Sequence, residues 1–234
     1  SGATSCFLVR IGIITALKPE ARVFRRASGL LCSEHEYTVT IGGAGRENAA
    51  RTANQLIRNG YELLISWGVA GALVEHLGAG DLLIGSHAMT GTGEILKFDQ
   101  QFERRVLSIL EPSMTVHTGT VVTVADAATS ARSKAHLRRR FGADAVDMES
   151  TAIAYVARSA GVGYLCARSI VDAADFNVPQ AAIKGLDKSG QLRPLKSLQS
   201  LAENPRQFPE MITLARNFRR SLKTLRNVAR QLTD

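Results

Sequence analysis

Two acidic residues, Glu149 and Asp172, have the type and setting of groups that do chemistry on a small molecule. Each follows a short apolar segment, and carboxylates held at strand ends serve in general acid–base catalysis or bind a sugar diol. Vicinal hydroxyls donate two charge-assisted hydrogen bonds to one carboxylate, which suits Glu149. A desolvated Asp in a cleft holds a proton for a leaving group, which suits Asp172. A helix-start Glu and a loop-capping Asp would give the same pattern, so spacing alone leaves both interpretations open.

The stretch 144–175 must position both carboxylates. Its pattern predicts a strand over Asp144–Met148, a helix that begins at Glu149, and a second strand over Tyr164–Val171. A crossover of this kind is normally right-handed and returns a parallel neighbour. Glu149 and Asp172 would then lie at the carboxyl ends of two strands, where open α/β sheets bind ligands.

Apolar strand-like segments alternate with helical segments through the rest of the main body. The predicted strands are Phe7–Thr15, Tyr37–Ile41, Leu63–Trp67, Asp81–His87 and Val116–Val124, and the predicted helices are Arg46–Arg58, Phe98–Leu110 and Ala131–Phe141. This alternation predicts a single α/β domain with three α/β/α layers. Residues 176–198 are polar, and we expect them to be irregular.

Two glycine-rich segments are candidate ligand contacts. The turn Gly42–Gly45 precedes a predicted helix, and such a turn exposes backbone N–H groups that can bind an anion. Gly45 and Arg46 are therefore candidate phosphate contacts, although an ordinary tight turn explains the pattern equally well. The second segment follows a buried strand, and its small residues would let backbone approach a ligand. The candidate contacts there are Val69, Ala70 and Gly71.

Glu20 is a third acidic residue at the end of a predicted strand. It follows Lys18 and Pro19, and both Pro and Glu favour the first turn of a helix. On spacing alone, a helix-start role for Glu20 is the simpler interpretation.

The positive charge of the chain is concentrated at its C-terminal end. The formal net charge is +8, and residues 184–234 hold eleven Lys/Arg against four Asp/Glu, which is +7. A predicted helix from Glu210 to Leu232 is amphipathic and cationic. Its apolar stripe is Met211, Ala215, Phe218, Leu222, Leu225 and Ala229, and its cations are Arg216, Arg219, Arg220, Lys223, Arg226 and Arg230.

Three roles stay open for this basic helix: packing its stripe on the sheet, docking to anionic lipid headgroups, or binding nucleic acid. The basic residues are not interleaved with aromatic ones in the way that base stacking needs. We therefore prefer peripheral contact with the inner membrane through residues 210–232 and expect no nucleic-acid partner. The expected organisation is one domain over residues 1–234, with the basic helix of 204–234 appended to it.

Composition disfavours several other classes of protein. Cys6, Cys32 and Cys166 form no CxxC pair, and the histidines show no metal-ligand spacing, so we expect neither a disulfide scaffold nor a metal site. No apolar run approaches the length of a transmembrane helix, and no signal peptide is evident. The expectation is a reduced, cytoplasmic protein without a cofactor.

Four motifs follow one another in the first three quarters of the chain. They are Ile11-Gly12-Ile13-Ile14 with Glu20, Gly68-Val69-Ala70-Gly71, Val146-Asp147-Met148-Glu149-Ser150, and Arg168-Ser169-Ile170-Val171-Asp172. In order and spacing they resemble the nucleoside phosphorylase/nucleosidase superfamily, above all the methylthioadenosine/S-adenosylhomocysteine nucleosidases. The resemblance implies a nucleoside phosphorylase-like sandwich with a mixed central sheet, a purine nucleosidase or nucleoside phosphorylase activity, and a homo-oligomer.

The resemblance also implies catalytic roles. Asp172 would protonate purine N7 and so make adenine a better leaving group. Glu20 would position and activate the attacking water, helped by Arg168. The transition state would resemble a ribosyl oxocarbenium ion, stabilised by leaving-group protonation and electrostatics.

For substrate binding, the resemblance implies that Glu149 holds the ribose 2′ and 3′ hydroxyls while Met148 packs on the sugar. The purine would contact backbone near Val124–Ala127, together with Phe176.

The sequence departs from the nucleosidases at three points that bear on the nucleophile and the 5′ side of the ribose. Val69 stands where Ser or Thr is frequent, so a side-chain hydrogen bond to water or phosphate is lost. The segment after Asp81–His87 is shorter, which would leave the site more open. Lys18 is the cation of the first loop, and Arg46 is a substitute phosphate ligand. Glu20 favours water, and phosphate stays open as a co-substrate.

The tail is unlike that of a methylthioadenosine nucleosidase. The segment 186–195, LDKSGQLRPL, and the Arg-rich helix after it resemble the hopanoid-associated phosphorylase branch. That branch is implicated in removing adenine from adenosylhopane, an adenosine with a pentacyclic lipid at its 5′ position. Our main hypothesis is this reaction. The alternatives are a methylthioadenosine/S-adenosylhomocysteine nucleosidase in solution and a non-catalytic nucleoside-binding protein.

Overall fold

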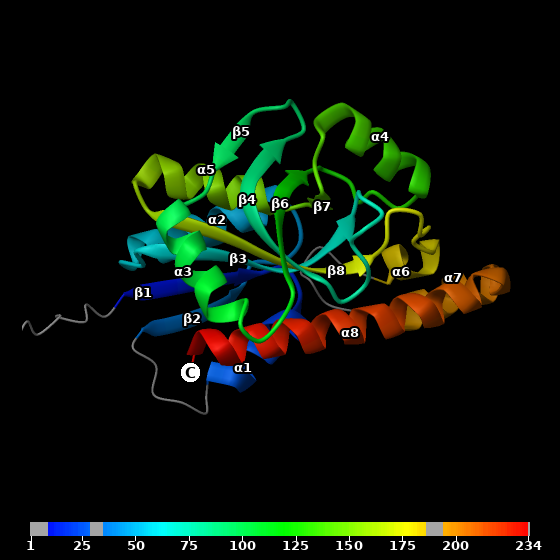
Figure 1. Cartoon of the computed structure of the whole chain (residues 1–234). Coiled ribbons are helices and arrows are strands. Elements are labelled where there is room, and N and C mark those ends of the chain that lie inside the picture. Colours follow the sequence, from blue (N-terminus) through cyan, green and yellow to red (C-terminus); the bar gives the residue numbers. More distant parts are fainter. Residues whose placement is uncertain (1–8, 29–34, 186–193, 234) are drawn as a thin grey trace, which may run out of the picture.

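The computed structural model describes residues 9–28, 35–185 and 194–233 (Figure 1). Its strands are β1 (Arg10–Thr15), β2 (Glu36–Ile41), β3 (Leu63–Ala72), β4 (Leu82–Thr90), β5 (Ile95–Lys97), β6 (Val116–Thr123), β7 (Ala145–Asp147) and β8 (Gly163–Asp172). Its helices are α1 (Lys18–Ser28), α2 (Arg46–Arg58), α3 (Gln100–Leu110), α4 (Ala131–Phe141), α5 (Ser150–Ala160), α6 (Gln180–Lys184), α7 (Pro194–Glu203) and α8 (Phe208–Thr233), with a short 3₁₀ helix at Pro205–Gln207.

The sheet is mixed, as predicted, and part of it closes on itself. The strand order is β2-β1-β3-β7-β6-β4-β5, and β8 pairs with both β3 and β4. Strands β3, β7, β6, β4 and β8 therefore form a closed circuit, from which β1 and β2 extend the sheet in parallel register. The site is thus built at the rim of a closed set of strands rather than at the edge of an open sheet.

The prediction that the 144–175 crossover returns a parallel neighbour is wrong. β7 pairs antiparallel with the end of β3, through Gly71 and Val146, whereas β8 runs parallel to β3. The two strands therefore run in opposite directions and do not neighbour each other, because β3 takes a different partner at its last residues. Gly71 nevertheless pairs with Asp172 as well as with Val146, so both arms of the crossover end beside the same glycine.

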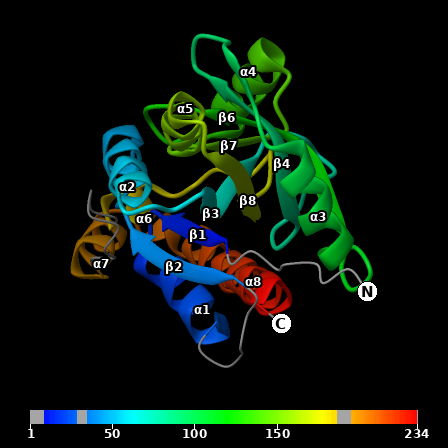
Figure 2. The same ribbon diagram turned by 90° about the vertical axis from the view of Figure 1, so that its left-hand side faces the viewer.

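Helices cover both faces of the sheet (Figure 2). On one face, α2 and α5 pack against each other and bury a core that includes Leu64, Ile153 and Cys166. On the other face, α1, α3 and α8 enclose a second core around Trp67, whose ring meets Phe24 edge-on at a centroid distance of 5.0 Å. This arrangement confirms the predicted three-layer sandwich.

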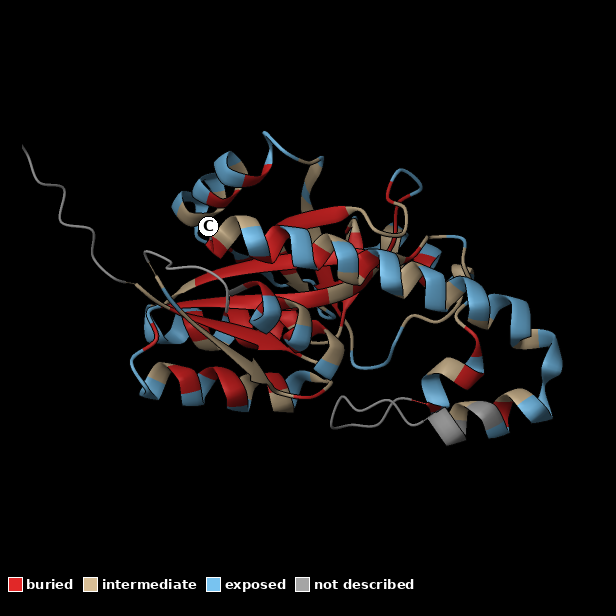
Figure 3. Ribbon diagram, turned by 90° about the horizontal axis from the view of Figure 1, so that it is seen from below, coloured by how far each residue is buried: buried red, intermediate tan, exposed pale blue. Residues whose placement is uncertain are grey.

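Helix α8 has two different halves (Figure 3). From Ser221 onward it packs on the sheet: Leu225 is fully buried, and the hydroxyl of Ser221 donates to the carbonyl of Ile170 at 2.5 Å. The first half projects beyond the sheet and leaves Phe208 and Ile212 exposed, at 53% and 37%. The predicted apolar stripe is therefore core only in its second half. No helix among the described residues is long and apolar enough to span a membrane.

Some elements differ from the sequence-based expectation. β3 continues to Ala72, beyond the predicted bound at Trp67, and β5 was not predicted. The expected irregular stretch 176–198 contains α6 and the start of α7, while residues 186–193, with most of the tail motif, lie outside the described part of the chain.

Candidate active site

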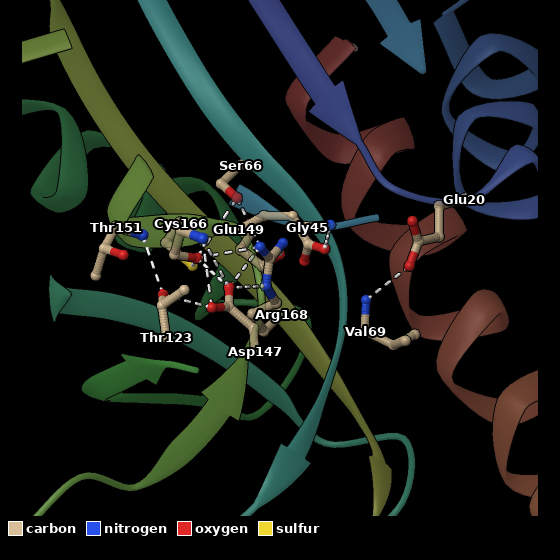
Figure 4. Close-up of polar contacts among 12 residues, drawn as sticks. Glu20, Gly45, Ser66, Val69, Thr123, Asp147, Glu149, Thr151, Cys166 and Arg168 are labelled. Atoms are coloured by element: carbon tan, nitrogen blue, oxygen red, sulfur yellow. Dashed lines mark hydrogen bonds and ion pairs between the residues drawn. The ribbon is translucent and has the colours of Figure 1, made fainter. Parts of the chain in front are cut away.

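Glu20 lies in the first turn of α1 and is buried, with 2% of its surface exposed. Its two carboxylate oxygens accept backbone N–H groups, from Leu17 at 2.8 Å and from Val69 at 3.0 Å. Figure 4 shows this carboxylate directed at the Val69 amide of β3. Burial raises the pKa of Glu20 to about 7, while these two hydrogen bonds and the charge of Arg168 oppose the rise. The group is poised to take up or release a proton near neutral pH.

Glu149 precedes the first residue of α5 and faces the glycine-rich turn. Its Oε1 accepts the backbone N–H of Gly45 at 2.8 Å (Figure 4). Burial and the nearby Asp147 carboxylate raise the pKa of Glu149 to about 7, and Arg168 and the amides of Gly45 and Met148 oppose that rise. The backbone N–H of Gly45 therefore already donates to a protein carboxylate, which argues against the predicted role of Gly45 as a phosphate contact.

Asp172 is the last residue of β8 and is 6% exposed. Its Oδ2 forms an ion pair with Lys134, a residue of α4. Burial raises the pKa of Asp172, and the adjacent Lys134 ammonium opposes part of that rise. Burial and the neighbouring cation therefore act on the pKa of Asp172 in opposite directions.

Two glycines of β3 make room for these carboxylates. A Cβ placed on Gly68 would lie 2.7 Å from Oε1 of Glu20, and one on Gly71 would lie 3.0 Å from Oδ2 of Asp172. Neither glycine has the positive φ that would require glycine for backbone reasons. We predicted Gly71 as a ligand contact; the structure shows that the closest approach at both glycines comes from the protein's own acids.

Arg168 is fixed in a buried network beside the carboxylates. Its guanidinium donates to Oδ2 of Asp147 at 2.7 and 3.0 Å and to the hydroxyl of Ser66 at 2.6 Å (Figure 4). The predicted partnership with Glu20 is therefore not a hydrogen bond in this structure. Arg168 acts on Glu20 and Glu149 through its charge, which lowers the pKa of both.

The other predicted contacts lie in four places: in β3, directly after β6, in the loop after β8 and at the start of α2. Val69 contributes its backbone N–H to Glu20, and Ala70 is buried in β3 beside it. Val124 lines a surface cavity of about 520 Å³ between β6 and α4, whose other walls are Asp126, Ala127, Ala128, Ser130, Arg132, Ser133, His136, Leu137 and Arg139. Phe176 presents its carbonyl to Lys134, at 2.9 Å. Arg46 is exposed at the start of α2.

Sequence reasoning missed Lys134 and underused Asp147. Lys134 stands in a helix whose composition reads as solvated, so no local signal marks it as buried. Asp147 was visible in the Val-Asp-Met-Glu motif, but its hydrogen bonds to Arg168 and Thr123 depend on tertiary structure. Cys166 is a buried thiol in the same network, and burial raises its pKa to about 11, so it stays protonated. Among the described residues, no group of three or more His, Cys, Asp or Glu could hold a metal ion.

Comparison with known proteins bears on this geometry. The sequence profile of the phosphorylase superfamily matches residues 10–198. The 5′-methylthioadenosine/S-adenosylhomocysteine nucleosidase of Staphylococcus aureus is 25% identical over 213 residues, which cover 76% of this chain and 93% of that protein.

Two solved structures share the fold. The futalosine hydrolase of Helicobacter pylori superimposes with a TM-score of 0.74 at 18% identity, over 97% of this chain and 98% of its own. The 5′-methylthioadenosine/S-adenosylhomocysteine nucleosidase of Neisseria meningitidis, in complex with methylthio-immucillin-A, gives a TM-score of 0.74 at 17% identity, over 96% and 98%.

Proposed function

This chain belongs to the phosphorylase superfamily, a family of enzymes that act on N-ribosyl bonds, and on that premise we propose that it releases adenine from a 5′-substituted adenosine. One observation carries the proposal: Glu20 and Asp172 are buried acids beside β3, Glu149 is a half-buried acid near them, and desolvation raises the pKa of each. Several acids with raised pKa values in one region are typical of a site that moves protons. The relatives named above as nucleosidases support the same reaction class.

In the proposed mechanism, the bond between ribose C1′ and purine N9 breaks, and its electron pair moves into the purine. Asp172 donates its proton to N7, so that neutral adenine leaves. Water then attacks C1′, and the Glu20 carboxylate accepts a proton from it. Glu149 accepts hydrogen bonds from the 2′ and 3′ hydroxyls and places the sugar between the other two acids.

Water is the nucleophile that the site supports better than phosphate. Glu20 is held by two backbone amides beside β3, where an attacking water needs a base. The Gly45 amide is already engaged by Glu149, and Arg46 is exposed at the surface. Phosphate remains the alternative, and the assay below distinguishes the two.

For the 5′ substituent we propose a lipid, so that the substrate is adenosylhopane. This rests on the resemblance of the tail to the hopanoid-associated branch and on the exposed, cationic first half of α8. The second candidate is methylthioadenosine or S-adenosylhomocysteine, and the name of the Staphylococcus aureus relative favours it. The third, a non-catalytic nucleoside-binding protein, needs neither a base nor an acid and is the least supported.

The test is adenine release from methylthioadenosine and from adenosylhopane, each with and without phosphate, with identification of the sugar product. We expect release without phosphate and a free ribose hydroxyl at C1′. Asp172→Asn should lower kcat by at least about 10²-fold while the variant still binds substrate. Normal turnover by Asp172→Asn would contradict the assignment of the acid, and no release from either nucleoside would contradict the proposed function.

We also propose peripheral membrane contact through the projecting half of α8. Phe208 and Ile212 are exposed apolar side chains there, and Arg216 and Arg219 on the same half are exposed cations. The matching partner is a bilayer with anionic headgroups. The variant Phe208→Ser/Ile212→Ser should bind anionic vesicles less than wild type does, whereas Ile109→Ser on α3, similar in exposure at 39%, should not. Equal binding by all three proteins would overturn this contact.

A homo-oligomer is the remaining proposal for partners. Ile95 and Tyr155 are exposed apolar side chains, at 52% and 53%, on the adjacent elements β5 and α5. We propose that these two side chains form part of the surface that contacts a second copy. Light scattering should give at least twice the 25.2 kDa chain mass.

A further inference from the structure

Lys134 is an unusual residue for its position. Helix α4 is rich in Arg, and its other residues are half-buried or exposed. Lys134 is its buried residue and has 0% of its surface exposed. A charged amine taken out of water is costly unless it is fully paired. The fold therefore has to supply partners for every N–H of this ammonium.

Lys134 Nζ has three partners, one for each N–H donor of a lysine ammonium. Nζ donates to the carbonyl of Ala173 at 2.6 Å and to the carbonyl of Phe176 at 2.9 Å. The third partner is Oδ2 of Asp172, the acid of the proposed reaction. All three acceptors lie in one short segment, which starts at the last residue of β8.

The same segment is fastened to the start of α4 at two further points. The side chain of Asn177 accepts the backbone N–H of Ala131 at 2.9 Å, and the N–H of Val178 donates to the carbonyl of Thr129 at 2.7 Å. Lys134 thus lies at the centre of a junction between α4 and the loop that follows the acid. Lys134 contacts Asp172 directly, whereas the hydrogen bonds of Asn177 and Val178 in this junction do not involve Asp172.

We propose that Lys134 is a positioning residue of the reaction, which holds the Asp172 carboxyl by Oδ2 and ties it to the Ala173–Phe176 loop. This inference rests on the proposed function. With Oδ2 engaged by the ammonium, Oδ1 is the oxygen that carries the proton to purine N7. When the proton has moved, the carboxylate that remains is stabilised by the adjacent cation, so the transfer is favoured in the direction of adenine release.

Burial and the cation act on Asp172 in opposite directions. Burial raises the pKa of Asp172, and the Lys134 ammonium lowers it, which strengthens the acid. Without the cation the proton would be held more tightly. Because the acid works in its protonated form, activity falls as pH rises through this pKa, and loss of Lys134 should move that falling limb to higher pH.

The test compares Lys134→Gln and Lys134→Met with wild type. Gln keeps donor N–H groups without the charge, and Met keeps the length of the side chain. Asn177→Ala is the matched control, because it loosens the same junction without touching Asp172. The measurements are kcat, KM for methylthioadenosine, and the pH profile of kcat/KM, with circular dichroism to establish the folded fraction.

We expect both Lys134 variants to lose roughly 10²-fold in kcat, with KM changed less than threefold and the falling limb moved to higher pH. Asn177→Ala should keep the wild-type limb. A folded Lys134 variant with the wild-type limb and kcat would overturn the inference while leaving the proposed function intact. If neither variant folds, Lys134 serves stability alone and the inference is overturned. If wild type releases no adenine from any nucleoside, the proposed function fails and the inference fails with it.

Discussion

At the scale of single residues, the site depends on the absence of two side chains. Gly68 and Gly71 leave the space that Glu20 and Asp172 occupy, so the smallest added group competes with a carboxylate. The β-strand geometry itself would accept alanine at both positions, because neither has a positive φ. The effect of substitution should therefore fall on the acids rather than on the backbone.

Gly68→Ala should lower kcat by roughly 10²-fold while the protein stays folded, because its Cβ would lie 2.7 Å from Oε1 of Glu20. The matched control is Gly78→Ala, whose Cβ would meet its nearest neighbour, Oδ2 of Asp81, at an ordinary contact distance of 3.7 Å. Steady-state adenine release and circular dichroism check both. Wild-type activity in Gly68→Ala would show that Glu20 is not held where the proposed mechanism needs it.

The raised pKa of Glu20 and Glu149 predicts the rising limb of the pH profile. Burial raises both to about 7. Glu20 works as a base in its ionised form, so kcat/KM should rise as pH increases through about 7. Because Glu20 and Glu149 interact, the apparent pKa of this limb describes the titration of the pair rather than of either residue alone. In Glu149→Gln the limb should persist with Glu20 alone, at lower overall activity. A wild-type profile that is flat from pH 5 to 8 would contradict the assignment.

At the scale of elements, α8 combines a core helix with a projecting one. Leu225→Ala should lower the free energy of unfolding by about 2–5 kcal/mol, because Leu225 is fully buried against the sheet. Ile212→Ala, on the projecting half, should change it by less than about 0.5 kcal/mol. Urea denaturation of the two variants makes the comparison. Equal destabilisation would mean that the projecting half is also packed.

The helices show how far local sequence determines structure. The bounds of α2 and α4 agree with the predicted ranges. Gly45 and an apolar face mark α2, and α4 was predicted as a polar helix that Gly142 follows. The capping box of Ser130 and Ser133 strengthens the start of α4. The two halves of α8 could not be separated from sequence, since the apolar stripe continues through both and only the extent of the sheet decides which half is covered. Lys134 was missed for the same reason: its partners come from another part of the chain.

At the scale of the whole molecule, the closed circuit of strands joins both cores. β3 and β8 contribute residues to each core, so neither helical layer can unfold without disturbing strands of the circuit. We expect one cooperative transition in urea. Trp67, the chain's one tryptophan, reports on the core beneath α1, and far-ultraviolet circular dichroism reports on all helices. The two transitions should coincide; fluorescence change well before loss of helix would contradict a single cooperative unit.

The closed circuit of strands is the part of the fold that could not be predicted from sequence. Strand positions and the α/β class follow from local patterns, and the resemblance implied a mixed sheet. The order of the strands, and with it the opposite directions of β7 and β8, depends on which partner each part of β3 takes. Gly71 meeting both Val146 and Asp172 is a contact among residues far apart in the chain. The roles of Glu149 and Asp172 stay predictions, and local patterns could not show that β7 and β8 both pair with Gly71.

The burial of Lys134 makes its amine a chemical reporter. Amine acylation needs an accessible nitrogen, and Nζ of Lys134 is enclosed while α4 and the Ala173–Phe176 loop stay joined. A brief pulse of an acylating reagent should modify exposed lysines such as Lys97 and spare Lys134, as read by mass spectrometry. The rate at which Lys134 becomes labelled over longer exposure then measures how frequently this junction opens. The labelling rate of Lys134 thus reports local opening at the ion pair that holds Asp172 in place.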